Sequence, residues 1–217
     1  MSEEILDRIA YFGVVPVIAI ESVDVAIPLA DALIQGGLPV VEITFRTSAA
    51  AETICRMTKE RPELIVGAGT VLSVANLDAA KANGASFAVA PGLNPKMVKQ
   101  AQQMGLPFVP GIATPSDIDA GLSLGCELLK FFPAEANGGI EMIEALSAPY
   151  KHTGVRFMPT GGVDHANLET YLKINTVAAV GGTWIAKKED LSQGNWGEIQ
   201  KRCQAALRVV KKARGKD

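Results

Sequence analysis

Histidine and cysteine are scarce in this chain, which has two histidines and three cysteines among 217 residues. His152 and His165 do not stand in H-x-H or H-x-x-x-H spacing, which argues against a histidine-rich zinc site, and we expect both at the surface or near a helix start. Cys55, Cys126 and Cys203 show no C-x-x-C spacing and are expected to be reduced, mostly buried thiols. The sequence therefore predicts no metal site.

Excess positive charge and long apolar runs are also lacking. The 21 basic and 23 acidic residues give a formal net charge of −2, so no nucleic-acid partner is predicted. No apolar run approaches the roughly 18 residues of a transmembrane helix, and the acidic start, residues 1–4, is unlike a signal peptide. One basic cluster, residues 211–216, is typical of a solvated helix end. We therefore expect a cytoplasmic protein without a membrane partner.

Short apolar runs alternate with helical segments after an initial helix at about residues 2–12. The expected strands span residues 14–20, 40–45, 65–71, 87–91, 107–112, 128–132, 156–160 and 177–181. This alternation is typical of parallel strands covered by helices. Eight such units predict a (β/α)₈ TIM barrel with an extra N-terminal helix, as a single domain over residues 1–217.

Capping residues mark several of the expected helix starts. Asn94-Pro95 and Thr114-Pro115 each combine an N-cap residue with a proline at the first helical position, and Ser73 and Asp164 are further expected N-caps. A doubly wound open sheet is the alternative fold. Its dinucleotide-binding form needs G-x-G-x-x-G, and residues 67–72 lack the third glycine. We therefore favour the barrel.

Polar side chains recur on one face of the expected strands. Glu42, Thr44 and Arg46 alternate with apolar residues, so the polar face of this strand points into the barrel. The same parity argument gives further inward sets: Val66, Ala68 and Thr70; Leu128, Lys130 and Phe132; Met158 and Thr160. Because catalytic residues of such barrels lie at the C-terminal ends of strands, we expect Glu42, Arg46, Thr70, Lys130 and Thr160 to form one site.

Lys130 is a charged residue within an apolar strand that ends at Pro133. Removal of an amine from water favours its neutral form, and a neutral amine can attack a carbonyl group. A purely structural ion pair with Glu42 is the alternative, but burying two charges costs several kcal/mol per ion. We therefore interpret Lys130 and Glu42 as catalytic.

Paired glycines follow two of the expected strands. Gly161-Gly162 comes after the seventh strand and Gly181-Gly182-Thr183 after the eighth, the usual place for a phosphate site in such barrels. Glycine lets backbone N–H groups approach an anion closely. One pair could be an ordinary tight turn, but two pairs at these positions predict a phosphate site.

Four segments together resemble a known family of enzymes: Glu42-Ile43-Thr44-Phe45-Arg46-Thr47, Gly67-Ala68-Gly69-Thr70-Val71, Leu129-Lys130-Phe131-Phe132-Pro133-Ala134 and Pro159-Thr160-Gly161-Gly162-Val163. In this order they resemble the 2-keto-3-deoxy-6-phosphogluconate (KDPG) aldolases, over roughly residues 5 to 210. The resemblance implies a class I aldolase, a lyase that needs no cofactor and cleaves KDPG to pyruvate and glyceraldehyde 3-phosphate. It also implies cleavage of 4-hydroxy-2-oxoglutarate (KHG) and a homotrimer.

The resemblance assigns a role to each matching residue. Lys130 matches the Schiff-base lysine and Glu42 the general acid and base. The other matches are substrate contacts: Arg46 and Thr70 for the pyruvate carboxylate, Thr160 for the hydroxylated part, Phe132 for the imine, Pro91 as a further contact, and Gly161, Gly162, Gly182 and Thr183 for the phosphate. Thr183 stands where the family pattern has serine and keeps the hydroxyl group.

Three other functions stay open at this point. An aldolase for the galactonate-derived epimer would share Lys130 and Glu42. A phosphosugar isomerase or epimerase would use Glu42 as a base and Lys130 only as an electrostatic stabiliser. A non-catalytic phosphometabolite-binding protein would keep the glycine loops but would have no reason to bury both charges.

Overall fold

The computed structural model describes residues 2–215; residues 1 and 216–217, with the extreme ends of the predicted domain and the last basic residue of the tail, lie outside this range. The strands are β1 (Val14–Ile18), β2 (Val40–Thr44), β3 (Ile65–Gly69), β4 (Phe87–Val89), β5 (Phe108–Val109), β6 (Gly111–Ile112), β7 (Leu128–Phe131), β8 (Arg156–Phe157) and β9 (Val180–Gly182). The α-helices are α1 (Ser2–Phe12), α2 (Ala26–Gln35), α3 (Ala50–Glu60), α4 (Val74–Ala82), α5 (Pro95–Gln103), α6 (Pro115–Ser123), α7 (Gly139–Ser147), α8 (Leu168–Leu172), α9 (Lys188–Gln193) and α10 (Trp196–Ala213). Short 3₁₀ helices are η1 (Val23–Val25), η2 (Glu135–Asn137) and η3 (Ala148–Thr153).

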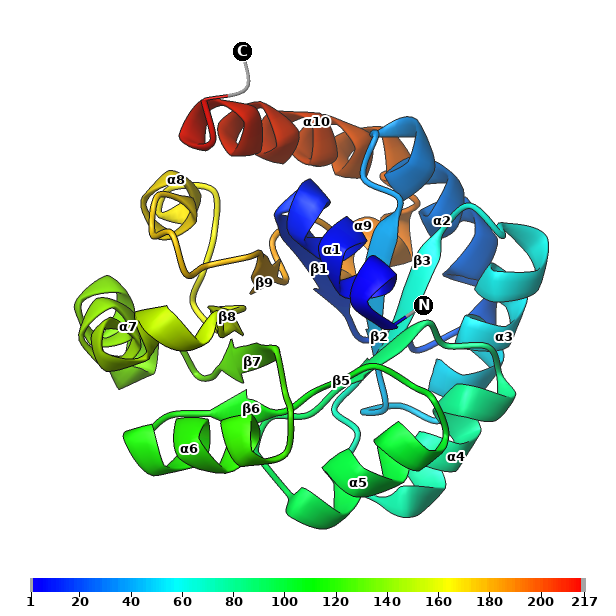
Figure 1. Ribbon diagram of the computed structural model, residues 1–217. Coiled ribbons are helices and arrows are strands. Elements are labelled where there is room, and N and C mark those ends of the chain that lie inside the picture. Colours follow the sequence, from blue (N-terminus) through cyan, green and yellow to red (C-terminus); the bar gives the residue numbers. More distant parts are fainter. Residues whose placement is uncertain (1, 216–217) are drawn as a thin grey trace.

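All paired strands are parallel. A six-stranded sheet has the order β5-β4-β3-β2-β1-β9, and a three-stranded sheet has the order β6-β7-β8. Figure 1 shows these strands in the middle of the molecule, with helices around them. The prediction of an α/β fold with parallel strands covered by helices is therefore confirmed.

The strand expected over residues 107–112 is divided in the structure. Pro110 separates β5 from β6, since proline has no backbone N–H to donate. β4 pairs with β5, whereas β7 pairs with β6. Two isolated parallel bridges, Phe157 with Val177 and Thr160 with Gly181, connect the three-stranded sheet to the segment that carries β9.

Helix α1 lies over the N-terminal ends of the strands (Figure 1). Its residues Leu6 and Ile9 are buried in the hydrophobic core. Asp7 accepts a hydrogen bond from Nη1 of Arg156 at 2.8 Å, which ties the helix to the start of β8. Since this end is closed, the opposite end, where the strands terminate, is left for a site.

Three of the four predicted helix caps are confirmed. The side chains of Ser73, Asn94 and Thr114 accept hydrogen bonds from the backbones of α4, α5 and α6. The prediction for Asp164 is wrong. Its carboxylate accepts a hydrogen bond from Ala166 N at 2.7 Å in a turn, and α8 begins only at Leu168.

The cysteines lie as the composition suggested. Cys126 and Cys203 are buried and Cys55 is partly buried, and all three are free thiols. Burial raises the pKa of Cys126 to about 11 and that of Cys203 to about 12, so both stay protonated at neutral pH. His152 and His165 are exposed. No helix among residues 2–215 is long and apolar enough to cross a membrane.

Candidate active site

A cavity of about 250 Å³ lies where the parallel strands end at their carboxyl termini. The residues predicted to form the site all line it: Glu42, Arg46, Thr70, Pro91, Lys130, Phe132, Thr160, Gly161, Gly162, Gly182 and Thr183. The structure therefore brings together residues that are far apart in the sequence, from the second expected strand to the eighth. Larger hollows exist, such as one of about 540 Å³ beside α1 and α10, but that hollow has no carboxylate in its lining.

Lys130 is fixed by the strands on both sides of it. Its backbone N–H donates to Pro110 O at 2.8 Å, and the neighbouring residue Phe131 accepts from Thr160 N at 2.9 Å. The side chain is 6% exposed, and its Nζ lies 3.6 Å from Oε1 of Glu42 and 5.3 Å from the ring centroid of Phe132. The amine thus meets one carboxylate and one aromatic face inside the cavity.

Glu42 is a buried carboxylate with unused hydrogen-bonding capacity. It is 1% exposed, and within the described residues neither Oε1 nor Oε2 has a hydrogen-bond partner. Gly69 on the neighbouring strand makes room for it, because a Cβ at that position would lie 2.1 Å from Glu42 Oε1. Buried polar groups nearly always have a hydrogen-bond partner, so a carboxylate without one beside an amine indicates a site for exchanging protons.

Arg46 is oriented by a chain of hydrogen bonds that starts in β1. Thr44, which is 1% exposed, donates from Oγ1 to Ile18 O at 3.3 Å. The same Oγ1 accepts from Arg46 Nε at 3.1 Å. Since Nε is occupied, the two terminal nitrogens of the guanidinium group remain for a ligand. A planar carboxylate is the ligand that this fork of donors fits.

Thr70 reaches the cavity by a route that differs from the expected one. The register pairs Glu42 with Gly67 and Thr44 with Gly69, so β3 turns its glycines towards the interior. The parity predicted for Val66 and Ala68 is therefore wrong, since they pair with Val41 and Ile43 on the helix-facing side. By alternation along β3, Thr70 would face the helices together with Val66 and Ala68. Its φ of 54°, in the left-handed region, turns it into the cavity instead. Such a conformation costs about 1–2 kcal/mol and is typical of functional sites.

The loops after β8 and β9 present backbone groups to the cavity. Gly161 and Gly162 have φ values of 98° and 80°, which favour glycine. A Cβ at Gly181 would lie 2.3 Å from Thr160 Oγ1, so the two strand ends pack closely. Among the described residues none accepts from the N–H groups of Gly162 or Thr183. These donors are therefore available for an anion.

Four cavity residues were not among the predicted site residues: Val17, Thr44, Val163 and Gly181. Thr44 shares the polar face with Glu42 and Arg46, so alternation did carry a signal for it. Gly181 and Val163 belong to the two glycine segments. Val17 lies in a continuous apolar run of β1, in which every residue is buried, so no pattern distinguishes the residue that faces the cavity.

The donor set of the cavity is poor in metal ligands. Glu42 is its one carboxylate, and its other charged side chains are Arg46 and Lys130. Between residues 2 and 215 no group of three or more His, Cys, Asp or Glu side chains could hold a metal ion. The arrangement suits imine chemistry, with an amine as nucleophile, a carboxylate as proton carrier and separate donors for two anionic groups.

Comparison with known proteins points to the same chemistry. The family model described as KDPG and KHG aldolase matches residues 5–202. The 2-dehydro-3-deoxy-phosphogluconate aldolase of Haemophilus influenzae is 41% identical over 210 residues, which is 97% of this chain and 98% of the relative.

Two solved structures are similar over nearly their whole length. The KDPG aldolase of Legionella pneumophila, with pyruvate captured as a covalent carbinolamine intermediate, superposes with a TM-score of 0.89 at 37% identity, covering 95% of this chain and 98% of that one. The Zymomonas mobilis ZM4 enzyme with 3-phosphoglycerate gives 0.85 at 38% identity, with coverage of 96% and 95%. This chain belongs to the KDPG and KHG aldolase family.

Proposed function

We propose that this protein is a class I aldolase that reversibly cleaves KDPG to pyruvate and D-glyceraldehyde 3-phosphate. The observation that carries the proposal is the buried Lys130 amine, 3.6 Å from a Glu42 carboxylate that has no other partner among the described residues. Family membership supports it, as does the Legionella relative, in which pyruvate was captured as a carbinolamine.

The first step joins the substrate to Lys130. Arg46 and Thr70 bind the carboxylate next to the ketone, which brings the carbonyl carbon to the amine. Neutral Lys130 attacks that carbon, the carbonyl oxygen takes a proton, and a carbinolamine results. Loss of water from it gives a protonated imine between Nζ and the former ketone carbon. Glu42 is the carboxyl group close enough to supply and receive these protons.

The second step breaks the carbon–carbon bond. Glu42, directly or through a water molecule, takes the proton of the C4 hydroxyl group, and the electrons of the C3–C4 bond move into the protonated imine. The aldehyde leaves and an enamine of pyruvate stays on Lys130. Glu42 then returns a proton to the methylene carbon, and hydrolysis of the imine releases pyruvate and the free amine.

The loops after β8 and β9 account for the phosphate. In the proposed binding mode the phosphate lies on the opposite side of Lys130 from Arg46, where Gly162 and Thr183 offer N–H donors that have no acceptor among the described residues. KHG carries the same pyruvate unit without a phosphate, so we propose it as a second substrate that yields glyoxylate. The galactonate-series epimer remains the alternative substrate, and comparison of cleavage rates for both epimers decides between them.

The finer architecture also belongs to the proposal. Counting β5 and β6 as one strand interrupted at Pro110 gives eight parallel strands, and the bridge of Thr160 with Gly181 joins the last two. These pairings support a single-domain (β/α)₈ barrel over the chain. A homotrimer remains a prediction from the resemblance, and a cytoplasmic location remains a prediction from the composition. Light scattering after size-exclusion chromatography tests the mass of the assembly.

Trapping with borohydride tests the proposed function. Reduction of the protein in the presence of pyruvate should fix the imine, and peptide mass mapping should place the adduct on Lys130. An adduct on Lys173 or Lys187 instead, or no adduct at all, overturns the mechanism. The absence of an adduct together with isomerisation of a phosphosugar would identify the rival isomerase or epimerase, in which Lys130 acts only through its charge.

A further inference from the structure

The segment of residues 183–187 connects the cavity with the surface of the molecule. Gly182 and Thr183 line the cavity at the end of β9, and Lys187 immediately precedes α9. The segment is neither helix nor strand. Its path, and with it the position of Thr183, therefore depends on contacts made by side chains.

The first half of the segment is held by packing. The ring of Trp184 lies directly against Gly182, because a Cβ at Gly182 would lie 1.6 Å from Trp184 Cζ3. Ile185 follows and is fully buried. Movement of Trp184 or Ile185 is thus transmitted to the residues that face the cavity.

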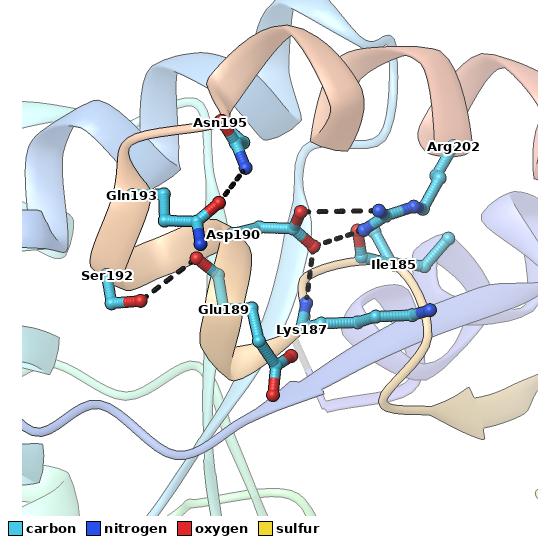
Figure 2. A network of polar contacts seen from close by, with 8 residues as sticks. All are labelled: Ile185, Lys187, Glu189, Asp190, Ser192, Gln193, Asn195 and Arg202. Carbon is cyan, nitrogen blue, oxygen red and sulfur yellow. Dashed lines mark hydrogen bonds and ion pairs between the residues drawn. The ribbon is translucent and has the colours of Figure 1, made fainter.

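The second half is held by an ion pair between α9 and α10. Asp190 Oδ2 accepts from Lys187 N at 3.1 Å, and its Oδ1 accepts from Arg202 Nη2 at 3.3 Å. Arg202 Nη1 donates to Asp190 Oδ2 and also to Ile185 O, the latter at 3.3 Å. Figure 2 shows Asp190 between the backbone at Lys187 and the guanidinium group of Arg202. One arginine therefore holds both the middle of the segment and the carboxylate that fixes its end.

This ion pair differs from those on the surface of the protein. Asp190 is only 6% exposed and is one of few charged residues in the interior. The hydrogen bond from Arg202 lowers the pKa of the Asp190 carboxyl group, so it is ionised at neutral pH. Helix α9 has six residues and is too short to define the segment by itself.

We propose that the Asp190–Arg202 pair is a positioning device for the phosphate end of the active site. By holding residues 185–187 against α10, it sets where Gly182 and Thr183 meet the phosphate of the substrate. The inference rests on the proposed function and extends it to Asp190 and Arg202, which do not line the cavity. Arg202 acts through the segment and touches no substrate.

Two substrates separate positioning from mere stability. KDPG and KHG share the pyruvate unit, but only KDPG has a phosphate. Loss of the ion pair should raise KM for KDPG about tenfold, the effect of weakening a charge-assisted hydrogen bond to the substrate. KM for KHG, and the rate of pyruvate trapping on Lys130, should stay at their wild-type values. Inhibition of KDPG cleavage by inorganic phosphate should weaken by the same factor as KM rises.

The variants are Arg202→Met and Arg202→Lys, with circular dichroism to verify the fold. Lysine keeps the charge but lacks the guanidinium fork that bonds Asp190 and Ile185 O at once. Arg202→Lys should therefore show the same selective rise in KM for KDPG, but a smaller one. Arg61→Met is the matched control. Arg61 also makes a two-bond ion pair, with Asp31 at 2.5 and 3.0 Å, but this pair makes no hydrogen bond to residues 183–187.

Each outcome decides a separate point. A selective rise for KDPG in both Arg202 variants, absent in Arg61→Met, supports positioning. Equal shifts for both substrates, or none in folded Arg202→Lys and Arg202→Met proteins, overturn it and leave the pair a structural contact. A wild-type protein that neither cleaves KDPG nor traps pyruvate refutes the proposed function itself, so the two failures are distinct.

Discussion

The two ends of the active-site cavity are built in opposite ways. The end proposed to bind the substrate carboxylate, called the carboxylate end, consists of Arg46 after β2 and Thr70 after β3. Arg46 is held by Thr44 and, through it, by the backbone of β1. The end proposed to bind the phosphate, called the phosphate end, consists of the loops after β8 and β9, whose glycines line the cavity. Arg46 at the carboxylate end depends on the regular alternation of a strand, whereas the phosphate end depends on glycine conformations and on the contacts of the residues behind its loop.

This difference predicts which substitutions affect which substrates. KDPG and KHG both present a pyruvate unit to Lys130, Glu42 and the carboxylate end, so a change there should affect both substrates equally. A change at the phosphate end should affect KDPG alone. Lys130 and Glu42 carry the proposed chemistry for both substrates, and substitutions there should have the largest effects.

Glu42→Gln is the substitution that should slow both substrates most while leaving the nucleophile in place. Without a carboxylate, neither the hydroxyl proton nor the enamine proton can be transferred efficiently. We expect turnover to fall by roughly 10²–10⁴-fold for KDPG and KHG alike. Steady-state rates measure this loss.

Two further measurements test the role of Glu42 alone. Trapping of pyruvate by borohydride should partly survive, because Lys130 remains. Exchange of the pyruvate methyl protons with solvent, followed by NMR, should slow together with turnover. Exchange at nearly the wild-type rate would contradict the assignment of proton transfer to Glu42.

Gly162→Val should separate the two ends of the cavity. Gly162 has φ 80°, which strains any other residue, and a Cβ there would lie 2.5 Å from Glu135 Cγ, so either the loop or Glu135 must move. We expect KM for KDPG to rise about 10-fold to 10²-fold, whereas KM for KHG changes little. The ratio of the two KM values is the measurement.

Gly154→Val is the matched control for this substitution. Gly154 has a similar φ of 78°, but a Cβ there would meet nothing within 4 Å and the residue lies outside the cavity lining. Gly154→Val therefore introduces the same backbone strain but leaves the proposed phosphate-binding N–H groups in place. An equal loss for both substrates in Gly162→Val would mean that this loop is only a turn and the phosphate binds elsewhere.

The regular parts of the fold were predictable from the sequence. Runs of buried residues such as Val40–Thr44 have the length and composition of central parallel strands, and the caps at Asn94 and Thr114 fixed two helix starts. The break at Pro110 was less evident because the residues on both sides remain extended. Asp164 was misleading since an Asp favours a tight turn as readily as a helix cap.

Site residues were predictable where strand alternation holds. Glu42 and Arg46 follow from the polar face of one strand, and Lys130 from its apolar surroundings. Thr70 was grouped with the site for a reason that fails, because its left-handed backbone reverses the parity of β3. No sequence pattern pointed to the Asp190–Arg202 pair. The two residues meet only because α9, α10 and the segment before α9 lie together in the fold.

Thr44→Val sharpens the comparison from the carboxylate end. Valine has the shape of threonine but cannot accept the hydrogen bond from Arg46 Nε, so the guanidinium group loses its fixed orientation. KM should rise about threefold to tenfold, as expected for one hydrogen bond worth about 1 kcal/mol, and by the same factor for KDPG and KHG. Thr44→Ser keeps the hydroxyl group and should restore the wild-type values. A shift confined to KDPG would place Arg46 at the phosphate instead.

Removal of divalent metal ions should have no effect at either end. The phosphate end offers N–H donors, and the protonated imine on Lys130 takes up the electrons that a bound cation would otherwise stabilise. Glu42 is the one carboxylate in the cavity lining, and a single carboxylate makes a poor ligand set. Exhaustive dialysis against a chelator should therefore leave the rates for KDPG and KHG unchanged. A large loss of the cleavage rate for both substrates that Zn²⁺ or Mg²⁺ restores would mean that a metal ion, and not the imine, stabilises the electrons. A loss of rate for KDPG alone would mean that the phosphate is bound through a cation.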